Sequence, residues 1–235
     1  MDDGLEVAGY LKSKFKKDKI YIEGLSWGTT VASFMVQKNP DLFYAYIGIG
    51  QMANQSLSEQ LSWDFVMEQA RANSDSVSIH KLLDIGRPPY PDKTDIEMAE
   101  ACDIERPILG KYVPYKFPFD NPMLKLIKTV MLYRGVKFKD KFRPLLNSYP
   151  GYVILWPTCF NVNLMRDVPE WQVPVFIIQG DTDYQTDTSL VIAYFDSIQA
   201  PSKKLYLFEN ATHIASWEQS ERFREIMIHD VLKLP

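Results

Sequence analysis

The sequence predicts an α/β fold, with a mostly parallel sheet of about four strands and an inserted helical cap. Short apolar runs typical of buried strands alternate with helix-spaced segments near both ends of the chain. Between these segments, residues 52–165 contain no convincing run of strands. We therefore expect a core at 1–51 and 166–235 that is interrupted by a helical cap at 52–165.

The first core segment should run helix, strand, helix, strand. Apolar residues recur at helix spacing over 3–16 and again over 29–38. Residues 19–23 alternate between apolar and polar side chains, and residues 44–50 are mostly apolar, as in a strand buried on both faces. Because a helix and short connections join the two strands, we expect parallel pairing through a right-handed crossover.

Two patterns in the cap match capping boxes, in which a Ser or Thr and a Glu three residues later satisfy the first N–H groups of a helix. They are Ser56 with Glu59 and Thr94 with Glu97, so helices should begin at both places. Large aromatic residues are frequent in the cap: Trp63, Phe65, Tyr112, Tyr115, Phe117, Phe119, Tyr133, Phe138, Trp156 and Phe160. We expect the cap to lie over Ser26, with aromatic residues facing the candidate site and excluding water.

The second core segment should supply two more strands. Residues 174–180 form an apolar run that ends at a glycine, and a helix is expected at 187–199. A last strand at 203–209 precedes a terminal helix at 218–232. Strands and helices therefore alternate on both sides of the cap, as in α/β proteins.

A nucleophile elbow is predicted where the first strand meets the second helix. The residues there are Gly24-Leu25-Ser26-Trp27-Gly28, a G-x-S-x-G pattern in strand–turn–helix context. The turn should hold Ser26 at a strained positive φ, with small residues at Gly24 and Gly28 because neighbouring backbone passes close by. The Ser26 hydroxyl would stand free above the sheet, and the N–H of Trp27 would point at a developing oxyanion.

Three candidate catalytic residues each follow the C-terminal end of a predicted strand: Ser26, Asp183 and His213. Open α/β sheets hold their sites at that edge, so the three side chains should meet. His213 would take the proton of Ser26 and return it to the leaving group, while an acid orients the imidazole. We favour Asp183, because a loop residue three past the strand-ending glycine can turn back over the sheet; Asp181 and Asp187 are the alternatives.

Three segments together resemble the α/β-hydrolases: Gly24–Thr29, Gly180–Asp183 and Phe208–His213. Trp27, directly after the serine, is similar to the proline iminopeptidase group of serine peptidases. The resemblance implies a serine hydrolase that cleaves an ester or peptide/amide bond of a small molecule or short peptide through an acyl-enzyme. It implies no cofactor and no metal. The alternative is an inactive or truncated remnant of this fold that acts as a binding domain.

The sheet departs from this resemblance. α/β-hydrolases have about eight strands, and an earlier His-Gly-Gly-type loop supplies their second oxyanion N–H. The sequence before residue 19 contains neither the additional strands nor this loop. We therefore expect the C-terminal portion of a longer protein or a chain that begins at an internal Met. The strand at 19–23 should then have an unpaired edge, which predicts poor solubility or a homodimer through that edge, unless the helix at 3–16 shields it.

The substrate stays open at this point. An aminopeptidase needs acidic groups in its cap to bind a substrate ammonium, and Glu59, Glu68, Glu97 and Glu100 are available. We expect each of them to face solvent. An aromatic-rich cap suits an apolar or aryl group equally well.

Composition argues against several other classes. The 235-residue chain has a formal net charge of −4, which gives no sign of a nucleic-acid partner. Its two cysteines, Cys102 and Cys159, match no metal or redox pattern and suit a reducing, cytoplasmic compartment. Because the N-terminus lacks an apolar signal segment and no run is long enough to span a bilayer, we expect no membrane partner.

Overall fold

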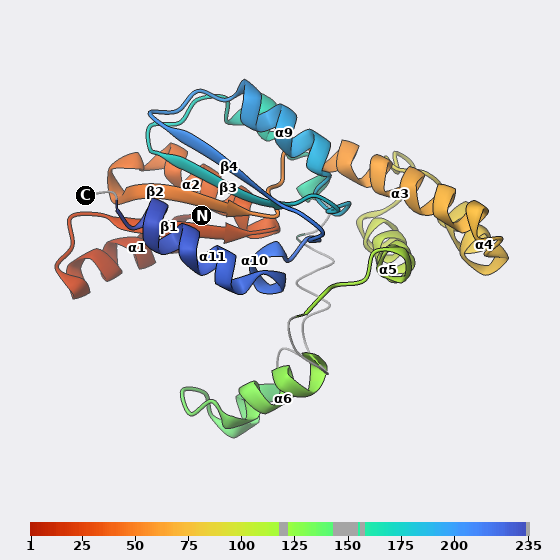
Figure 1. Cartoon of the computed structure of the whole chain (residues 1–235), viewed down its shortest axis with the longest axis horizontal. Helices are drawn as coiled ribbons and strands as arrows, with labels where there is room; N and C mark the ends of the chain where they lie inside the picture. Colours follow the sequence, from red (N-terminus) through yellow and green to blue (C-terminus); the bar gives the residue numbers. More distant parts are fainter. Residues whose placement is uncertain (118–121, 143–154, 156–157, 234–235) are drawn as a thin grey trace.

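The computed structural model describes residues 1–117, 122–142, 155 and 158–233. Within these residues, four strands form one parallel sheet, as the sequence predicts, and their order is β1-β2-β3-β4 (Figure 1). The strands are β1 (Ile20–Leu25), β2 (Phe43–Ile49), β3 (Val175–Gly180) and β4 (Lys203–Phe208). Because all four are parallel, their carboxyl ends share one edge, and the cap lies beyond that edge (Figure 1).

Helices cover both faces of the sheet. One face carries α1 (Asp2–Phe15), α2 (Trp27–Lys38) and α9 (Thr188–Ser197), and the other carries α10 (Ala215–Glu218), α11 (Ser220–Ile226) and the π-helical turn η3 (Met227–Val231). A 3₁₀ turn, η1 (Pro40–Leu42), leads from α2 into β2. Each fully buried apolar side chain between these layers, such as Ile177 or Phe208, stabilises the fold by roughly 1.5–3 kcal/mol.

The terminal helix predicted over 218–232 is present over 220–231, where α11 continues directly into η3, but it begins after Gln219 rather than at Glu218. Gln219 leaves helical geometry between α10 and α11, with φ −123° and ψ 56°. At the end of α10, the carboxylate of Glu218 accepts from the N–H (2.5 Å) and the hydroxyl (2.9 Å) of Thr212. These bonds anchor α10 to the loop after β4, and the terminal helix begins only after this anchor.

The described part of residues 52–165 is helical, as the sequence predicts. It contains α3 (Gln55–Ala72), α4 (Ser76–Ile85), α5 (Asp95–Tyr112), α6 (Pro122–Leu132) and the 3₁₀ turn η2 (Phe138–Phe142), and α8 (Leu164–Asp167) begins as the chain returns to the sheet. α3, α4 and α5 enclose a core of their own that includes Val66, Leu82 and Ile108. In the described chain, no helix combines the length and the apolar character needed to cross a bilayer.

One of the two predicted capping boxes is confirmed. Thr94 and Glu97 cap α5 through bonds in both directions. The box predicted at Ser56 and Glu59 is wrong, because Asn54 caps α3 by accepting an N–H of the first turn. Ser56 therefore lies inside the helix.

Two chain segments, 53–55 and 162–164, connect the cap to the core and are hydrogen-bonded to each other. The N–H of Gln55 donates to the C=O of Val162 (3.2 Å), and the N–H of Leu164 donates to the C=O of Ala53 (2.7 Å). The outgoing and returning segments thus pair like short antiparallel strands. This neck ties the first turn of α3 to the segment that leads back into the core.

Candidate active site

Ser26 stands at the turn between β1 and α2, with a φ of 54° and a ψ of −124°. Its N–H donates to the C=O of Ile49 at the end of β2 (2.9 Å), and its C=O accepts from the N–H (2.8 Å) and the hydroxyl (2.6 Å) of Thr29. A turn tied at both ends can hold a non-glycine residue in such a sparsely populated conformation. The strained backbone that the sequence predicts at the elbow is therefore present.

The two glycines of the elbow differ in what they require. A Cβ at Gly24 would lie 2.5 Å from the carbonyl oxygen of Gly28, so only glycine fits where α2 passes β1. A Cβ at Gly28 would meet no atom within 4 Å. The expectation that the position needs a small residue is thus correct for Gly24 and wrong for Gly28, where a Cβ would fit. Gly28 instead supplies the backbone that approaches Gly24.

Trp27 is the first residue of α2, so its N–H belongs to the helix N–H groups that lack an intrahelical acceptor. The positive end of the helix dipole lies at the same turn. Trp27 itself is 39% exposed. The backbone at this turn can therefore stabilise negative charge that develops on a substrate oxygen.

Asp183 and His213 form a buried pair at the carboxyl edge of β3 and β4. Oδ2 of Asp183 lies 2.9 Å from Nδ1 of His213, and the two residues are only 2% and 7% exposed. The other carboxylate oxygen, Oδ1, accepts the N–H groups of Gln185 (2.9 Å) and Thr186 (3.1 Å). This arrangement fixes the direction of the imidazole, as an orienting acid does in a catalytic triad.

The two competing aspartates have other partners. Asp181 is exposed and accepts the N–H of Ala211 at 3.2 Å. Asp187 caps α9 by accepting two N–H groups of its first turn. Of the three aspartates after β3, the structure brings Asp183 to the imidazole.

The charge of Asp183 is set by opposing effects. Burial disfavours the carboxylate, but the charge of His213 and the hydrogen bonds from the imidazole and Thr186 outweigh burial, so the pKa of Asp183 is lowered. The acid is therefore ionised at neutral pH and can stabilise an imidazolium.

Two residues that sequence reasoning missed hold this pair in place. Gln179, wholly buried in β3, donates to Oδ2 of Asp183 (2.9 Å) and accepts the N–H of Gln51 (3.0 Å). The hydroxyl of Thr186 donates to the same Oδ2 at 2.7 Å. The available signal was a lone amide inside the apolar run 174–180, because a buried amide needs hydrogen-bond partners.

Gly50 is a third residue that the sequence analysis missed. Its φ is 54°, and a Cβ there would lie 2.9 Å from Cε1 of His213. Because Ser26 is hydrogen-bonded to Ile49, the serine and the imidazole flank the same peptide. Among the described contacts of these two residues, there is no hydrogen bond between the Ser26 hydroxyl and the imidazole. In active sites such a hydrogen bond often forms only when substrate is bound.

No family model matches the chain. The chain is 27% identical over 222 residues to the probable aminopeptidase YbaC of Bacillus subtilis (strain 168), a match that covers 94% of this chain and 68% of that protein. Among solved structures, an alpha/beta fold family hydrolase from Bacillus anthracis str. Sterne has a TM-score of 0.53 at 13% identity, over 97% of this chain and 72% of its own. The esterase EaEST from Exiguobacterium antarcticum has a TM-score of 0.54 at 14% identity, over 95% and 70%. The chain is an α/β-hydrolase by fold.

In this fold, α5 lies over the acid and the histidine. A hollow of about 110 Å³ separates them, with Arg106 and Leu109 on the cap side and Asp183 and His213 on the core side. Ser26 is not among the residues that line this hollow. The described part of the cap therefore covers the acid–histidine end of the site.

The described aromatic residues of the cap divide between the site and the core of the cap. Tyr115 lines the hollow, together with Tyr184 from the core. Other aromatic residues pack into or against the core of the cap: Trp63, Phe65, Tyr112 and Phe160. Phe119 and Trp156 lie outside the described residues. The expectation that aromatic residues of the cap face the site is thus correct for Tyr115 and wrong for the four that pack into or against the core of the cap, because the three cap helices need an apolar core of their own.

A second polar cluster is buried in the cap beside the hollow. Arg106, which lines the hollow, forms ion pairs with Glu59 and Glu105. Glu59 is only 3% exposed and accepts the amide of Gln55 at 2.6 Å. The expectation that Glu59 faces solvent is therefore wrong, because a guanidinium 47 residues along the chain compensates its charge. Exposed carboxylates are found, as expected, at Glu68, Glu97 and Glu100.

This cap cluster, Gln55, Glu59, Glu105 and Arg106, holds more negative than positive charge. Burial raises the pKa of Glu59, the charge of Arg106 opposes that rise, and the charge of Glu105 adds to it. Within the described residues, the buried Oε1 of Gln55 has no hydrogen-bond partner. The cluster thus contains two carboxyl groups, one guanidinium and one buried acceptor without a partner among the described residues.

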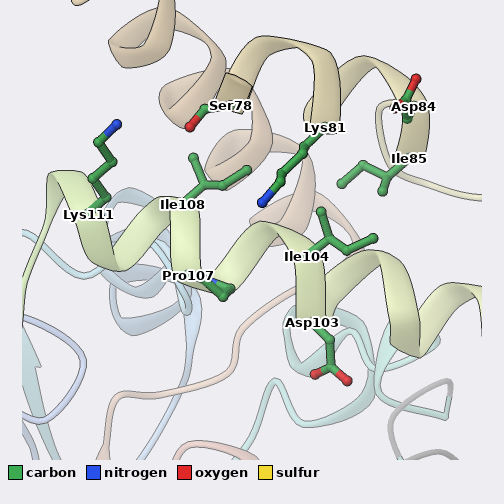
Figure 2. Close-up of a pocket in the computed structure, with 9 residues that line it drawn as sticks. All are labelled: Ser78, Lys81, Asp84, Ile85, Asp103, Ile104, Pro107, Ile108 and Lys111. Atoms are coloured by element: carbon green, nitrogen blue, oxygen red, sulfur yellow. The ribbon is translucent and has the colours of Figure 1, made fainter. Parts of the chain in front are cut away.

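A wider hollow of about 440 Å³ lies elsewhere on the cap, between α4 and α5 (Figure 2). Ile85, Ile104 and Ile108 point into it, whereas Asp103 points away (Figure 2). It contains none of the candidate catalytic residues. The smaller hollow over the acid and the histidine is therefore the one that fits the chemistry.

Within the described chain, no group of three or more His, Cys, Asp or Glu side chains is placed to hold a metal ion. Cys102 and Cys159 are free and buried. Burial raises the pKa of the Cys159 thiol to about 12, so this sulfur stays protonated at neutral pH.

Proposed function

We propose that this protein is a serine hydrolase in which Ser26 attacks an ester or peptide/amide carbonyl and forms an acyl-enzyme. His213 takes the proton of Ser26 through Nε2, since Nδ1 faces Asp183, and returns the proton to the leaving group. Asp183 holds the tautomer and stabilises the imidazolium. The observation that carries the proposal is the buried Asp183–His213 pair next to the strained elbow at Ser26.

The N–H of Trp27 is one oxyanion donor in this mechanism. It lies at the N-terminus of α2, next to the nucleophile in the chain, and its direction is set by the turn that strains Ser26. One donor of this kind typically contributes about 10²–10³ in rate. A backbone N–H, rather than a side chain, thus stabilises the negative charge that develops on the substrate oxygen.

The preferred substrate in this proposal is a short peptide or aminoacyl compound with a free amino group. The name of the relative YbaC, a probable aminopeptidase, supports this choice. The cap cluster supports it independently, because an ammonium would balance the second carboxylate of Glu59 and Glu105 and could donate to Gln55. Arg106 connects that cluster to the hollow over His213, so amino group and scissile carbonyl would bind at neighbouring places.

A fluorophosphonate probe tests the nucleophile. We expect covalent labelling and ester turnover in the wild type, and neither in Ser26→Ala. Ser74→Ala is a matched control, because Ser74 is also a serine with a positive φ, 53°, but lies in the cap between α3 and α4. Equal labelling of wild type and Ser26→Ala would refute the proposal. Absence of labelling in a folded wild type would favour the alternative, a hydrolase fold that binds without turnover.

A substrate pair tests the cap cluster. Glu59→Gln should raise the KM for an aminoacyl arylamide by about tenfold or more, the usual effect of losing a charge-assisted contact. Hydrolysis of an N-acetylated aryl ester, which has no ammonium, should change little. Glu68→Gln is the control, because Glu68 lies on the same helix and is exposed. An equal loss on both substrates would mean that Glu59 only supports the fold.

A further inference from the structure

The chain leaves the end of α5 through a short segment, residues 113–117, that contacts both loops of the candidate site. We call this segment the cap strap. The hydroxyl of Tyr115 accepts a hydrogen bond from Nε2 of Gln185 (2.5 Å), in the loop after β3 that carries the acid. Nζ of Lys116 donates to the C=O of Asn210 (2.9 Å), in the loop after β4 that carries the histidine. The cap strap is therefore bonded to the acid loop and to the histidine loop.

A further contact between the cap strap and the histidine loop runs through Glu218, the last residue of α10. Its Oε1 accepts the N–H of Lys116 (2.6 Å) and the hydroxyl of Thr212 (2.9 Å). Its Oε2 accepts the N–H of Thr212 (2.5 Å). Glu218 and Thr212 are only 9% and 2% exposed. One buried carboxylate thus joins the cap strap to the residue directly before His213.

The hydrogen bonds of Glu218 require a carboxylate rather than an amide. Each of its two oxygens faces a backbone N–H, one from Lys116 and one from Thr212. A backbone N–H can only donate, and a carboxylate offers two acceptor oxygens where an amide of the same shape offers one oxygen and one NH₂ group. A glutamate at this position can therefore hold both segments, whereas a glutamine can hold only one of them.

Both segments that Glu218 joins line the hollow over the acid and the histidine. Val113 and Tyr115 belong to the cap strap, and Thr212 and His213 belong to the loop after β4. A displacement of the cap strap would widen this hollow, next to which the proposed function seats the aminoacyl substrate. A displacement of Thr212 would instead shift the imidazole of His213.

We propose that Glu218 is a positioning residue of this hydrolase, which sets the shape of the hollow through the cap strap and the place of His213 through Thr212. The inference rests on the proposed function and gives one carboxylate two separable effects. The contact with Lys116 favours substrate binding and therefore acts mainly on KM. The contacts with Thr212 keep the imidazole in place and therefore act mainly on kcat.

Glu218→Gln should separate the two effects, because one of the two backbone N–H groups must then face the new NH₂ group. Thr212 is buried, so its N–H would be left without water, whereas Lys116 is exposed. The amide oxygen should therefore stay on the N–H of Thr212. The NH₂ group at the other position can still donate to the Thr212 hydroxyl, which accepts as well as donates. Glu218→Gln should thus release the cap strap and keep the histidine loop.

Hydrogen–deuterium exchange of the full chain, followed by peptide mass spectrometry, shows which segment is released. In Glu218→Gln the amide of Lys116 should exchange about tenfold faster, as expected for the loss of one hydrogen bond, and residues 210–214 should change little. Glu221→Gln is the matched control, because Glu221 is exposed and bonds to Arg224 within α11. Unchanged exchange in the cap strap, or faster exchange at 210–214 instead, would overturn the proposal.

Steady-state kinetics tests the two effects on catalysis. With an aminoacyl arylamide, Glu218→Gln should raise KM about three- to tenfold with a smaller change in kcat. Glu218→Ala also frees Thr212, so it should in addition lower kcat by about tenfold or more. If both variants only melt at a lower temperature and show no such difference between KM and kcat, the role of Glu218 is structural and the proposal is wrong.

Fluorophosphonate labelling separates this inference from the proposed function on which it rests. Absence of labelling in the folded wild type would refute the hydrolase, and this role of Glu218 with it. Labelling of the wild type, together with equal kinetics of Glu218→Gln and Glu221→Gln, would overturn the role of Glu218 alone.

Discussion

Replacing Asp183 by asparagine should leave the site assembled and reverse the tautomer of His213. Oδ1 of Asp183 accepts two backbone N–H groups, from Gln185 and Thr186. Because neither N–H can turn into an acceptor, the amide oxygen of Asp183→Asn must occupy that place. Its NH₂ group then takes the position of Oδ2, 2.9 Å from Nδ1 of His213. The imidazole must accept there, so its proton moves to Nε2, the nitrogen that has to accept the proton of Ser26.

The size of the effect follows from that reversal. In a Ser-His-Asp triad, the same change lowers kcat by about 10⁴, which corresponds to about 5.5 kcal/mol in the activation free energy at about 1.36 kcal/mol per tenfold. Stability should also fall, because the new NH₂ faces the amide donor of Gln179. The loss of a hydrogen bond to a charged group costs about 1.5–3 kcal/mol.

Two assays separate these effects. The rate of fluorophosphonate labelling and the turnover of an aryl ester report the chemistry, and thermal unfolding reports the stability. Asp181→Asn is the control, because Asp181 is exposed and does not contact the imidazole. If Asp183→Asn keeps more than about a tenth of the activity, or if Asp181→Asn is equally damaging, the assignment of the acid is wrong.

Further predictions concern the groups around this pair. Gln179→Met keeps the volume but removes a buried amide that bonds to Gln51, Asp183 and Thr186, so kcat should fall about tenfold and the melting temperature should drop. Unchanged kinetics would show that the amide only joins strands. Gly50→Ala combines a positive φ with a Cβ 2.9 Å from His213, so kcat should fall about tenfold with KM nearly kept, and a crystal structure should show a displaced imidazole. The lowered pKa of Asp183 stabilises the fold above its ordinary value of 3.8, and this contribution should be lost as pH falls through the lowered pKa. Chemical denaturation between about pH 5 and pH 3 should therefore show a steeper loss in wild type than in Asp183→Asn, and parallel curves would contradict it.

The sequence by itself determined the features that arise over short distances. The elbow is one strand, one turn and one helix within β1 and α2, so periodicity and a five-residue pattern were sufficient to predict the strain at Ser26. The parallel sheet followed from strands joined by helices, and Thr94 with Glu97 correctly marked the start of α5. Short-range patterns also failed where a stronger local competitor existed, as when Asn54 rather than Ser56 capped α3.

Only the tertiary structure decided which distant groups meet. Three aspartates follow β3 within a few residues, and the folding of their loop, not their spacing, selects the one that reaches His213. The amide of Gln179 and the burial of Glu59 depend on partners 128 and 47 residues away at Gln51 and Arg106. A buried polar group is tolerated only when such partners satisfy it, and their identity is a property of the packed chain rather than of any segment.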